Sequence, residues 1–302
     1  MKKFILYYLL LIFIASCSDE SAELTDETSE SVIVDITSFA GTNENKTKVG
    51  SGDSYALADT EFANIREFHF HKNNLIVLEV DDTYDYIRLI DIASNEVSDQ
   101  FQIGYLTLSH VWFDANTNTI YTSSGGDLYS KQKGGGTPQL LYEDADHMYI
   151  HDDDVFFIED GDSFGSSVLY KLNGNTKEKF FNDSFSYEPY FISNQDIYFQ
   201  DVNGIYMVNK DDDMADYENI LLESSIDEIV MTENNNFFYA KDQSGDLFYY
   251  EKGSTEPVLL TAPGSPYENQ FEIIEGLAID NENKILYVGD QSMIYSVKLN
   301  RL

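Results

Sequence analysis

The stretch GLAIDNENKILYVGDQSMIYSVKL, residues 276–299, decides the fold. Its three apolar segments are separated by two polar turns, at 280–283 and 289–292. Ile, Val and Tyr favour strands, whereas Asp, Asn and Gly favour tight turns. The stretch therefore predicts three short antiparallel strands joined by two hairpin turns.

The same pattern returns upstream at intervals of about 40 residues, which is the length of a propeller blade. The third-strand pairs are Tyr86-Ile87, Leu128-Tyr129, Leu169-Tyr170, Ile205-Tyr206, Leu247-Phe248 and Ile294-Tyr295. A fourth apolar segment closes most units, as at 139–142 and 257–260. A 3.6-residue apolar period is missing, which disfavours helical folds. The sequence thus predicts an all-β, six-bladed β-propeller of four-stranded antiparallel blades.

The last repeat ends without a fourth strand, while residues 32–37 (VIVDIT) form an isolated strand near the other end. Pairing the two would close the ring and remove an open sheet edge. We therefore expect an N-terminal strand to complete the sixth blade, with residues 40–60 as the loop into blade one. A seven-bladed ring and a ring closed entirely by C-terminal strands are the alternatives.

These repeats resemble the six-bladed propellers of the YWTD, NHL and TolB-like group. The resemblance rests on unit length and on strands such as LYVGD at 286–290 and IYTS at 120–123. The Trp of the YWTD pattern is absent from every unit. The group includes binding platforms, scaffolds and enzymes, so the resemblance implies a fold and leaves the function open.

The N-terminus has the pattern of a lipoprotein signal. Two lysines precede an apolar run of 11 residues, 4–14, which has the length of a signal-peptide core. The run ends in IASC at 14–17, which resembles the lipobox of bacterial lipoproteins. The resemblance implies a signal peptide over 1–16, cleavage before Cys17, and acyl chains on the cysteine. The alternative is an ordinary secretory signal with an incidental cysteine.

Residues 17–30 read as the lipidated cysteine followed by an acidic, flexible tether, and 31–302 as the propeller domain. The Ser18-Asp19-Glu20 sequence resembles the export signal of surface lipoproteins in Bacteroidota-type bacteria. We therefore expect a protein anchored in the outer membrane and displayed on the cell surface. The periplasmic face of that membrane is the alternative.

The charge of the chain excludes one class of partner. The chain has 18 Lys and Arg against 54 Asp and Glu, a formal net charge of −36. Such a surface repels phosphate backbones and anionic lipid headgroups, so we expect no nucleic-acid partner and a membrane link that is covalent. The single cysteine excludes an internal disulfide.

The first strands of the blades carry the candidate site, because they line the central channel of a propeller. Aligning the repeats places Glu67, His110, His147 and Glu228 at one level of the channel, with Pro189 and Gly276 in the other two blades. The next level holds His69, Trp112 and Tyr149. These side chains could form a pocket for a small polar ligand or a metal site. The third interpretation is ordinary strand-end polar groups, hydrogen-bonded around a water-filled channel.

No cofactor is expected. Acidic turns such as 152–154 and 211–213 suit calcium, but they lack the spacing of a calcium loop and also suit plain solvated turns. The sequence contains neither a phosphate-binding glycine loop before a helix nor an HExxH motif.

Taken together, the sequence predicts a lipid-anchored, non-catalytic binding or scaffold module with a protein or carbohydrate partner at the propeller face. The alternatives are a carbohydrate-capture accessory and an extracellular hydrolase or lyase. In the enzyme, Glu67, Glu228 and the histidines would act as acid or base at the channel mouth.

Overall fold

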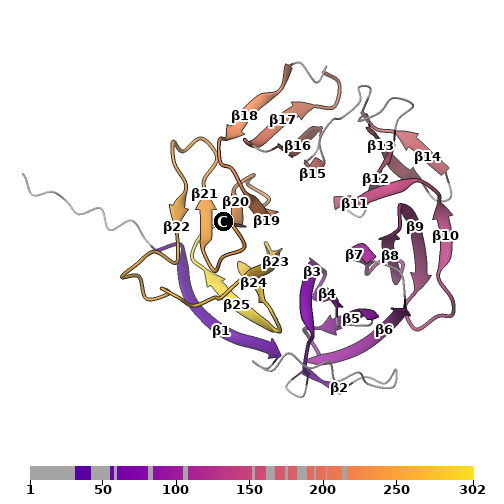
Figure 1. Ribbon diagram of the computed structural model, residues 1–302, viewed down its shortest axis with the longest axis horizontal. Helices are drawn as coiled ribbons and strands as arrows, with labels where there is room; N and C mark the ends of the chain where they lie inside the picture. Colours follow the sequence, from indigo (N-terminus) through magenta and orange to yellow (C-terminus); the bar gives the residue numbers. More distant parts are fainter. Residues whose placement is uncertain are drawn as a thin grey trace, which may run out of the picture. The chain divides into compact units, whose positions relative to one another are not determined.

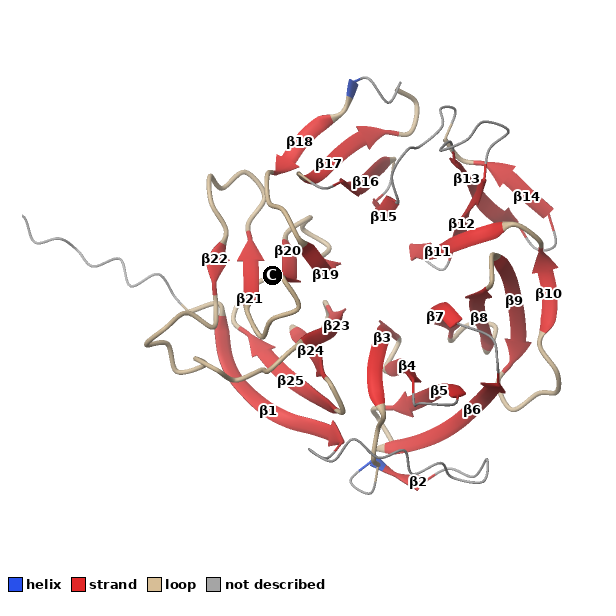
Figure 2. Ribbon diagram, in the orientation of Figure 1, coloured by secondary structure: helices blue, strands red, loops and turns tan. Residues whose placement is uncertain are grey.

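Each of the six repeats folds as an antiparallel sheet, and the sheets stand in a ring in the computed structural model (Figure 1). The structure describes residues 31–41, 55–57, 60–80, 84–104, 108–151, 154–160, 167–173, 176–181, 189–193, 195–201, 203–212 and 216–302. Almost all regular structure in these ranges is strand (Figure 2). The predicted all-β, six-bladed propeller is therefore confirmed, whereas the predicted signal peptide and tether lie outside the described residues.

The first three blades follow one another along the chain. Blade one contains β3 (Asn64–His71), β4 (Asn74–Val80), β5 (Tyr84–Asp91) and β6 (Glu96–Gly104), with β2 (Tyr55–Ala56) as a fifth strand outside β6. Blade two contains β7 (Leu108–Asp114), β8 (Thr119–Ser124), β9 (Asp127–Gln132) and β10 (Gln139–Tyr142). Blade three contains β11 (Ala145–His151), β12 (Asp154–Asp160), β13 (Ser167–Asn173) and β14 (Thr176–Lys179).

The other three blades follow the same order, except that the outermost strand of blade six comes from the N-terminal part of the described residues. Blade four contains β15 (Pro189–Ser193), β16 (Asp196–Asp201), β17 (Gly204–Asn209) and β18 (Glu218–Leu221). Blade five contains β19 (Ile226–Met231), β20 (Phe237–Lys241), β21 (Leu247–Tyr250) and β22 (Val258–Leu259). Blade six contains β23 (Ile274–Asp280), β24 (Ile285–Asp290), β25 (Met293–Leu299) and β1 (Ile33–Gly41).

The alternation of side chains along each second strand explains how the blades pack. Leu75 and Val77 of β4 belong to the apolar core shared with blade six, whereas Ile76 and Leu78 belong to the core shared with blade two. Successive side chains of a strand point to opposite faces, so a strand between two neighbours must be apolar throughout. Among the described residues there is one such core at each of the six junctions between neighbouring blades.

The ring is closed as the sequence predicted. Strand β1 pairs antiparallel with β25, with Ile36 opposite Val297. Ile33 at its start and Val32 just before it are buried in the core between blades five and six. Closure at this point gives β25 a partner on both sides and makes β1 the outer strand of the four-stranded sixth blade.

Two glycines of blade six hold an aromatic ring of blade one. Gly276 on β23 lies opposite Gly289 on β24, and the ring of Phe68 packs over both. A Cβ atom on Gly276 would lie 2.8 Å from Cδ1 of Phe68, and one on Gly289 would lie closer still. The missing side chains at 276 and 289 therefore create the socket for Phe68 at the junction where the ring closes.

Blade one contains a fully buried ion pair. Arg88 of β5 is 1 % exposed and Glu79 of β4 is 0 % exposed, and Arg88 Nε lies against Glu79 Oε1. Arg88 Nη1 also donates to the carbonyl oxygen of Glu61 at 2.8 Å, and Ala63 N donates to Glu79 Oε2 at 2.6 Å. The pair thus fastens the segment 61–63, through which the chain enters the first strand of blade one.

Candidate functional site

The first strands line the centre of the ring, and each contains an irregularity near its start (Figure 1). In every blade the pairing of the first strand with the second skips one residue at this point. The skipped residues are Arg66, Ser109, His147, Tyr190, Asp227 and Glu275. Such bulges bend a strand and re-aim side chains, and they are common beside functional sites. The skipped residues whose side chains the structure describes, Arg66, Asp227 and Glu275, are all charged.

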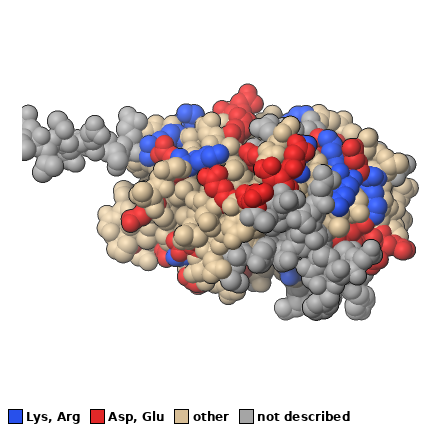
Figure 3. All heavy atoms as spheres, turned by 90° about the horizontal axis from the view of Figure 1, so that it is seen from above, with Lys and Arg blue, Asp and Glu red and all other residues tan. Residues whose placement is uncertain are grey.

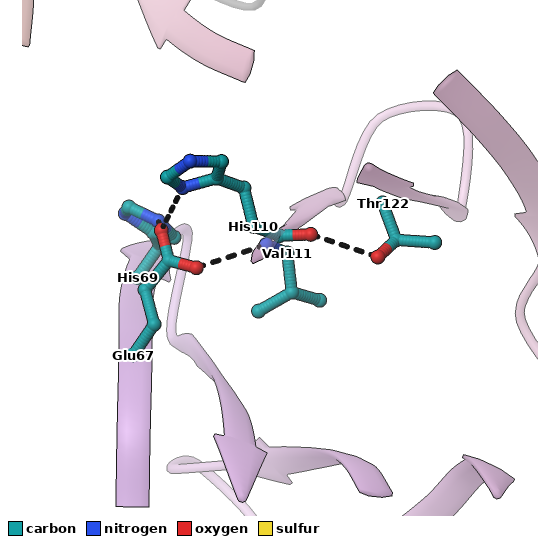
Figure 4. Close-up of polar contacts among 5 residues, drawn as sticks. All are labelled: Glu67, His69, His110, Val111 and Thr122. Atoms are coloured by element: carbon teal, nitrogen blue, oxygen red, sulfur yellow. Dashed lines mark hydrogen bonds and ion pairs between the residues drawn. The ribbon is translucent and has the colours of Figure 1, made fainter. Parts of the chain in front are cut away.

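Three of the predicted residues meet at Glu67. His69 Nε2 lies 2.7 Å from Glu67 Oε1, and Nδ1 of His110 on β7 lies 3.2 Å from the same oxygen (Figure 4). The other oxygen, Oε2, accepts a hydrogen bond from Val111 N at 3.2 Å. Thr122 Oγ1 donates to the carbonyl oxygen of His110 at 2.8 Å and so fixes the backbone that carries the imidazole. The channel therefore holds a carboxylate whose two oxygens are both engaged.

The surroundings of Glu67 favour its charged form. Burial alone would raise the pKa of Glu67, but the charges of and hydrogen bonds from His110 and His69 lower it to about 2. The three side chains remain partly open to the channel, with exposed fractions of 19 % for Glu67, 35 % for His69 and 25 % for His110. The arrangement is an ionised carboxylate held between two partly exposed histidines.

Trp112 of β7 lies beside this cluster and also packs against the apolar core between blades two and three. Its ring centroid lies 5.2 Å from that of His69 and 5.7 Å from that of His71. His71 is fixed by its Nδ1, which lies 3.1 Å from the carbonyl oxygen of Phe113. Trp112 Nε1 is buried and has no hydrogen-bond partner among the described residues. His71, which the sequence alignment did not select, therefore belongs to the same cluster as His69 and Trp112.

Two other predicted residues are not placed in this cluster. Tyr149 packs against the apolar core between blades three and four. The backbone of His147 belongs to β11, but its side chain lies outside the described residues. The position after the bulge, equivalent to Glu67 and His110, is Met148 in blade three and Phe191 in blade four. The sequence alignment had equated His147 and Pro189 with it, because it did not allow for the shorter strand between the bulge and the strand end in blades three and four.

The remaining predicted residue, Glu228, lines a separate pocket between blades five, six and one. The pocket has a volume of about 390 Å³. Its lining consists of Asn64, Ile65, Arg66, Val80, Asp227, Glu228, Gln243, Ile273, Ile274 and Glu275. Three of these, Arg66, Asp227 and Glu275, are the skipped residues of their bulges. The bulges therefore build the pocket by giving it charged side chains beside the channel-lining positions.

The carboxyl groups of this pocket have unusual electrostatics. Burial raises the pKa of Glu228 well above its ordinary value, and the negative charges of Glu67, Asp227 and Glu275 raise it further. Burial and the charge of Asp290 also raise the pKa of Glu275. Glu228 is half-buried and lines the pocket.

Five polar residues of the pocket lining were missed from the sequence: Asn64, Arg66, Asp227, Gln243 and Glu275. A signal was present for three of them, because each first strand reads apolar-polar-polar or apolar-polar-Gly at 65–67, 226–228 and 274–276. This break in strict alternation indicates a bulge. Gln243 lies beyond β20 and gives no such signal; its backbone N donates to Asp227 Oδ2 at 2.5 Å.

Among the described residues, no group of three or more His, Cys, Asp or Glu side chains is arranged to hold a metal ion. The acidic turn at 152–153 lies outside those residues, and Asp211 and Asp212 of the turn at 211–213 are exposed. In the part of the chain that the structure describes, no helix has the length and hydropathy to cross a membrane.

Neither a family model nor a curated protein matches the sequence. Solved structures match the fold. Regucalcin from Agrobacterium tumefaciens, a calcium-binding protein, has a TM-score of 0.56 at 12 % identity, over 80 % of this chain and 92 % of that one. A gluconolactonase from Xanthomonas campestris has a TM-score of 0.57 at 10 % identity, over 79 % and 86 %. PorZ, a surface component of the type-IX secretion system of Porphyromonas gingivalis, has a TM-score of 0.51 at 12 % identity, over 80 % and 47 %. At these identities the likeness shows that this chain is a six-bladed β-propeller, and no more.

Proposed function

We propose that this protein is a lipid-anchored binding module of the cell envelope, which takes a ligand or partner group at the bulged end of its channel. The observation that carries the proposal is the pocket of about 390 Å³ between blades five, six and one. Its volume is in the range of small-molecule sites, and it combines apolar walls with a few charged groups. Three of those groups come from bulges, which recur where a fold re-aims side chains toward a site.

The chemistry of Glu67 favours binding over catalysis. A general base works best when its pKa lies near the operating pH. Glu67, with a pKa of about 2, is a weak base, and both of its oxygens already accept hydrogen bonds. Glu67, His69 and His110 therefore form a fixed, polar part of the channel lining, and Glu67 does not act as a proton acceptor.

The anchor is proposed from the sequence of the N-terminus. Acyl chains on Cys17 would hold the protein at the outer membrane, and the acidic segment 18–30 would act as a spacer. We place the propeller on the cell surface, with the periplasmic face as the alternative. A partner protein or a carbohydrate would then be the ligand, and PorZ is an instance of a related fold at a bacterial surface.

The anchor is tested by Cys17→Ala. The variant should leave the membrane fraction and appear as soluble protein, because the acylated residue is lost. Protease treatment of intact cells should cut the wild-type propeller if it is displayed outside. Retention of the Cys17→Ala protein in washed membranes would overturn the anchoring part of the proposal.

The binding role is tested by a thermal-shift screen of glycans, peptides and small metabolites. Ligands that raise the melting temperature should lose that effect in Asp227→Asn and Glu275→Gln proteins. Glu282→Gln removes the same charge at an exposed turn outside the pocket and serves as the control. If every ligand acts equally on the three variants, the pocket is not the binding site.

One observation favours an enzyme as the second candidate. Glu67 has a lowered pKa and Glu228 a raised one, and two carboxyl groups separated in this way can serve as an ionised, charge-stabilising group and a general acid. Two of the solved structures with this fold are a gluconolactonase and a luciferin-regenerating enzyme. A panel of lactones, esters and glycosides would test this role. Turnover that falls about 100-fold or more in both Glu67→Gln and Glu228→Gln proteins would replace binding by catalysis.

A further inference from the structure

We propose that the pocket between blades five, six and one binds a primary ammonium group on a short alkyl chain. The group would come from a free amine or from the lysine side chain of a partner. This inference rests on the proposed binding function and names the chemistry of its ligand.

The first support is the composition of the pocket walls. Ile65, Ile273, Ile274 and Val80 provide apolar surface, and the carboxyl groups of Asp227, Glu228 and Glu275 lie on two neighbouring first strands, β19 and β23. An alkyl chain fits the apolar surface, and an ammonium group has three donors for carboxylate oxygens. A volume of about 390 Å³ accommodates a short chain with its charged end.

The second support is a difference between two carboxyl groups of the same channel. Glu67 has His69 and His110 as partners within 3.2 Å. Glu228 forms no ion pair with a basic residue that the structure describes, although it lies near the charges of Glu67, Asp227 and Glu275. A buried carboxyl surrounded by like charges is either protonated or paired with a cation. In the free protein, burial and the like charges favour the protonated state, and a ligand that brings a positive charge would favour the paired one.

Arg66 is the one basic side chain in the lining. It is exposed and forms no ion pair with a described residue. Its position at the rim predicts weak repulsion of an entering ammonium group. The net charge of −36 acts in the other direction, because an excess of acidic groups raises the local concentration of cations. On the face drawn in Figure 3, acidic patches lie among basic ones.

The proposal fixes the sign of a proton linkage. An ammonium group beside Glu228 stabilises its ionised form, so binding releases a proton and becomes tighter as pH rises. The groups that face Glu228 are Glu67 of β3, Asp227 of β19 and Glu275 of β23, with Arg66 at the rim. An alkylamine stays protonated between pH 6 and pH 8, so the ligand itself does not titrate there.

The test is calorimetric titration of the full chain carrying Cys17→Ala with three probes: n-pentylamine, 1-pentanol and the acetylated, amidated peptide Gly-Gly-Lys-Gly-Gly. We expect pentylamine or the peptide to bind at least tenfold more tightly than pentanol. Tighter binding of the peptide assigns the amine to a polypeptide, and tighter binding of pentylamine assigns it to a free amine. Equal affinity for pentylamine and pentanol, or binding of calcium chloride alone without either amine, would overturn the proposal.

Variants distinguish the effect of the pocket carboxyl Glu228 from a general effect of the net charge of the protein. Glu228→Gln should weaken amine binding at least fivefold and abolish the gain with rising pH, while Glu282→Gln should change neither. Arg66→Gln should tighten binding, which no folding defect would produce. If Glu228→Gln and Glu282→Gln behave alike, the inference is wrong. If amines fail but other ligands still depend on Asp227 and Glu275, the inference falls while the proposed function stands.

Discussion

The buried ion pair of blade one allows a sharp test of what holds the entry to the first strand. Arg88 and Glu79 are shielded from water, and together they hold the carbonyl of Glu61 and the amide of Ala63. Replacing one member, as in Arg88→Met, leaves the other as an unpaired charge in an apolar setting. Replacing both, as in Glu79→Leu with Arg88→Met, removes the charges together.

The expected changes in the free energy of unfolding follow from the burial of this pair. Breaking a buried pair by removing one partner costs about 3–5 kcal/mol. In a domain of this size that loss lowers the melting temperature by about 6–10 °C. The double variant is freed of the unpaired charge and loses only the hydrogen bonds to Glu61 and Ala63, at about 1–2 kcal/mol each. We therefore expect it to cost about 2–4 kcal/mol, well below the sum of the single variants.

Thermal and urea unfolding of the four proteins measures the coupling between the two residues. Arg301→Met is the matched control, because Arg301 pairs with Glu251 at 3.6 Å on the surface with 47 % of its side chain exposed. The control should change stability by less than about 1 kcal/mol. A single Arg88→Met variant as stable as the control, or a double variant as costly as the sum, would refute the account of this pair.

Two further outcomes follow from other parts of the structure. Gly289→Ala should destabilise the propeller by about 1–3 kcal/mol, because its Cβ would collide with the ring of Phe68. Adding Phe68→Leu should recover part of this loss of stability. Gly136→Ala is the control, because its Cβ would meet no neighbouring atom, and it should change stability little in the same melting assay. Stability should fall by about 3 kcal/mol as pH drops from about 5 to about 2, because the pKa of Glu67 is near 2 in the folded chain and 4.5 in the unfolded one. A Glu67→Gln protein should show a flatter acid profile, and an unchanged profile would mean that Glu67 does not carry this dependence.

The fold was largely predictable from the sequence, because a propeller repeats one physical solution six times. Each second strand is packed on both faces and so reads as a continuous apolar run, as at 75–78 and 286–288. The isolated apolar strand at 32–37 predicted the closure with β25 for a similar reason, since it had no other partner. The short strand β2, which adds an edge to blade one, was not predicted, because two residues give no periodic signal.

The candidate site was predictable only where the spacing of the first strands is uniform. Glu67, His69 and His110 come together as expected, because blades one and two have the same distance from bulge to strand end. Blades three and four have shorter first strands after their bulges, so the position equivalent to Glu67 shifts to Met148 and Phe191. A single skipped residue moves every side chain before it to the other face, and a sequence alignment without gaps cannot register that.

The pairing of β1 with β25 also constrains the order in which the protein can fold. Ile36 meets Val297, so nearly the whole chain must exist before these two strands can join. Contacts between residues this far apart in sequence are slow to form, because a very long loop must close first. Until then both β1 and β25 present unpaired backbone groups, which are templates for joining another chain. The protein is therefore most prone to aggregate between the synthesis of the sixth blade and the pairing of β1 with β25.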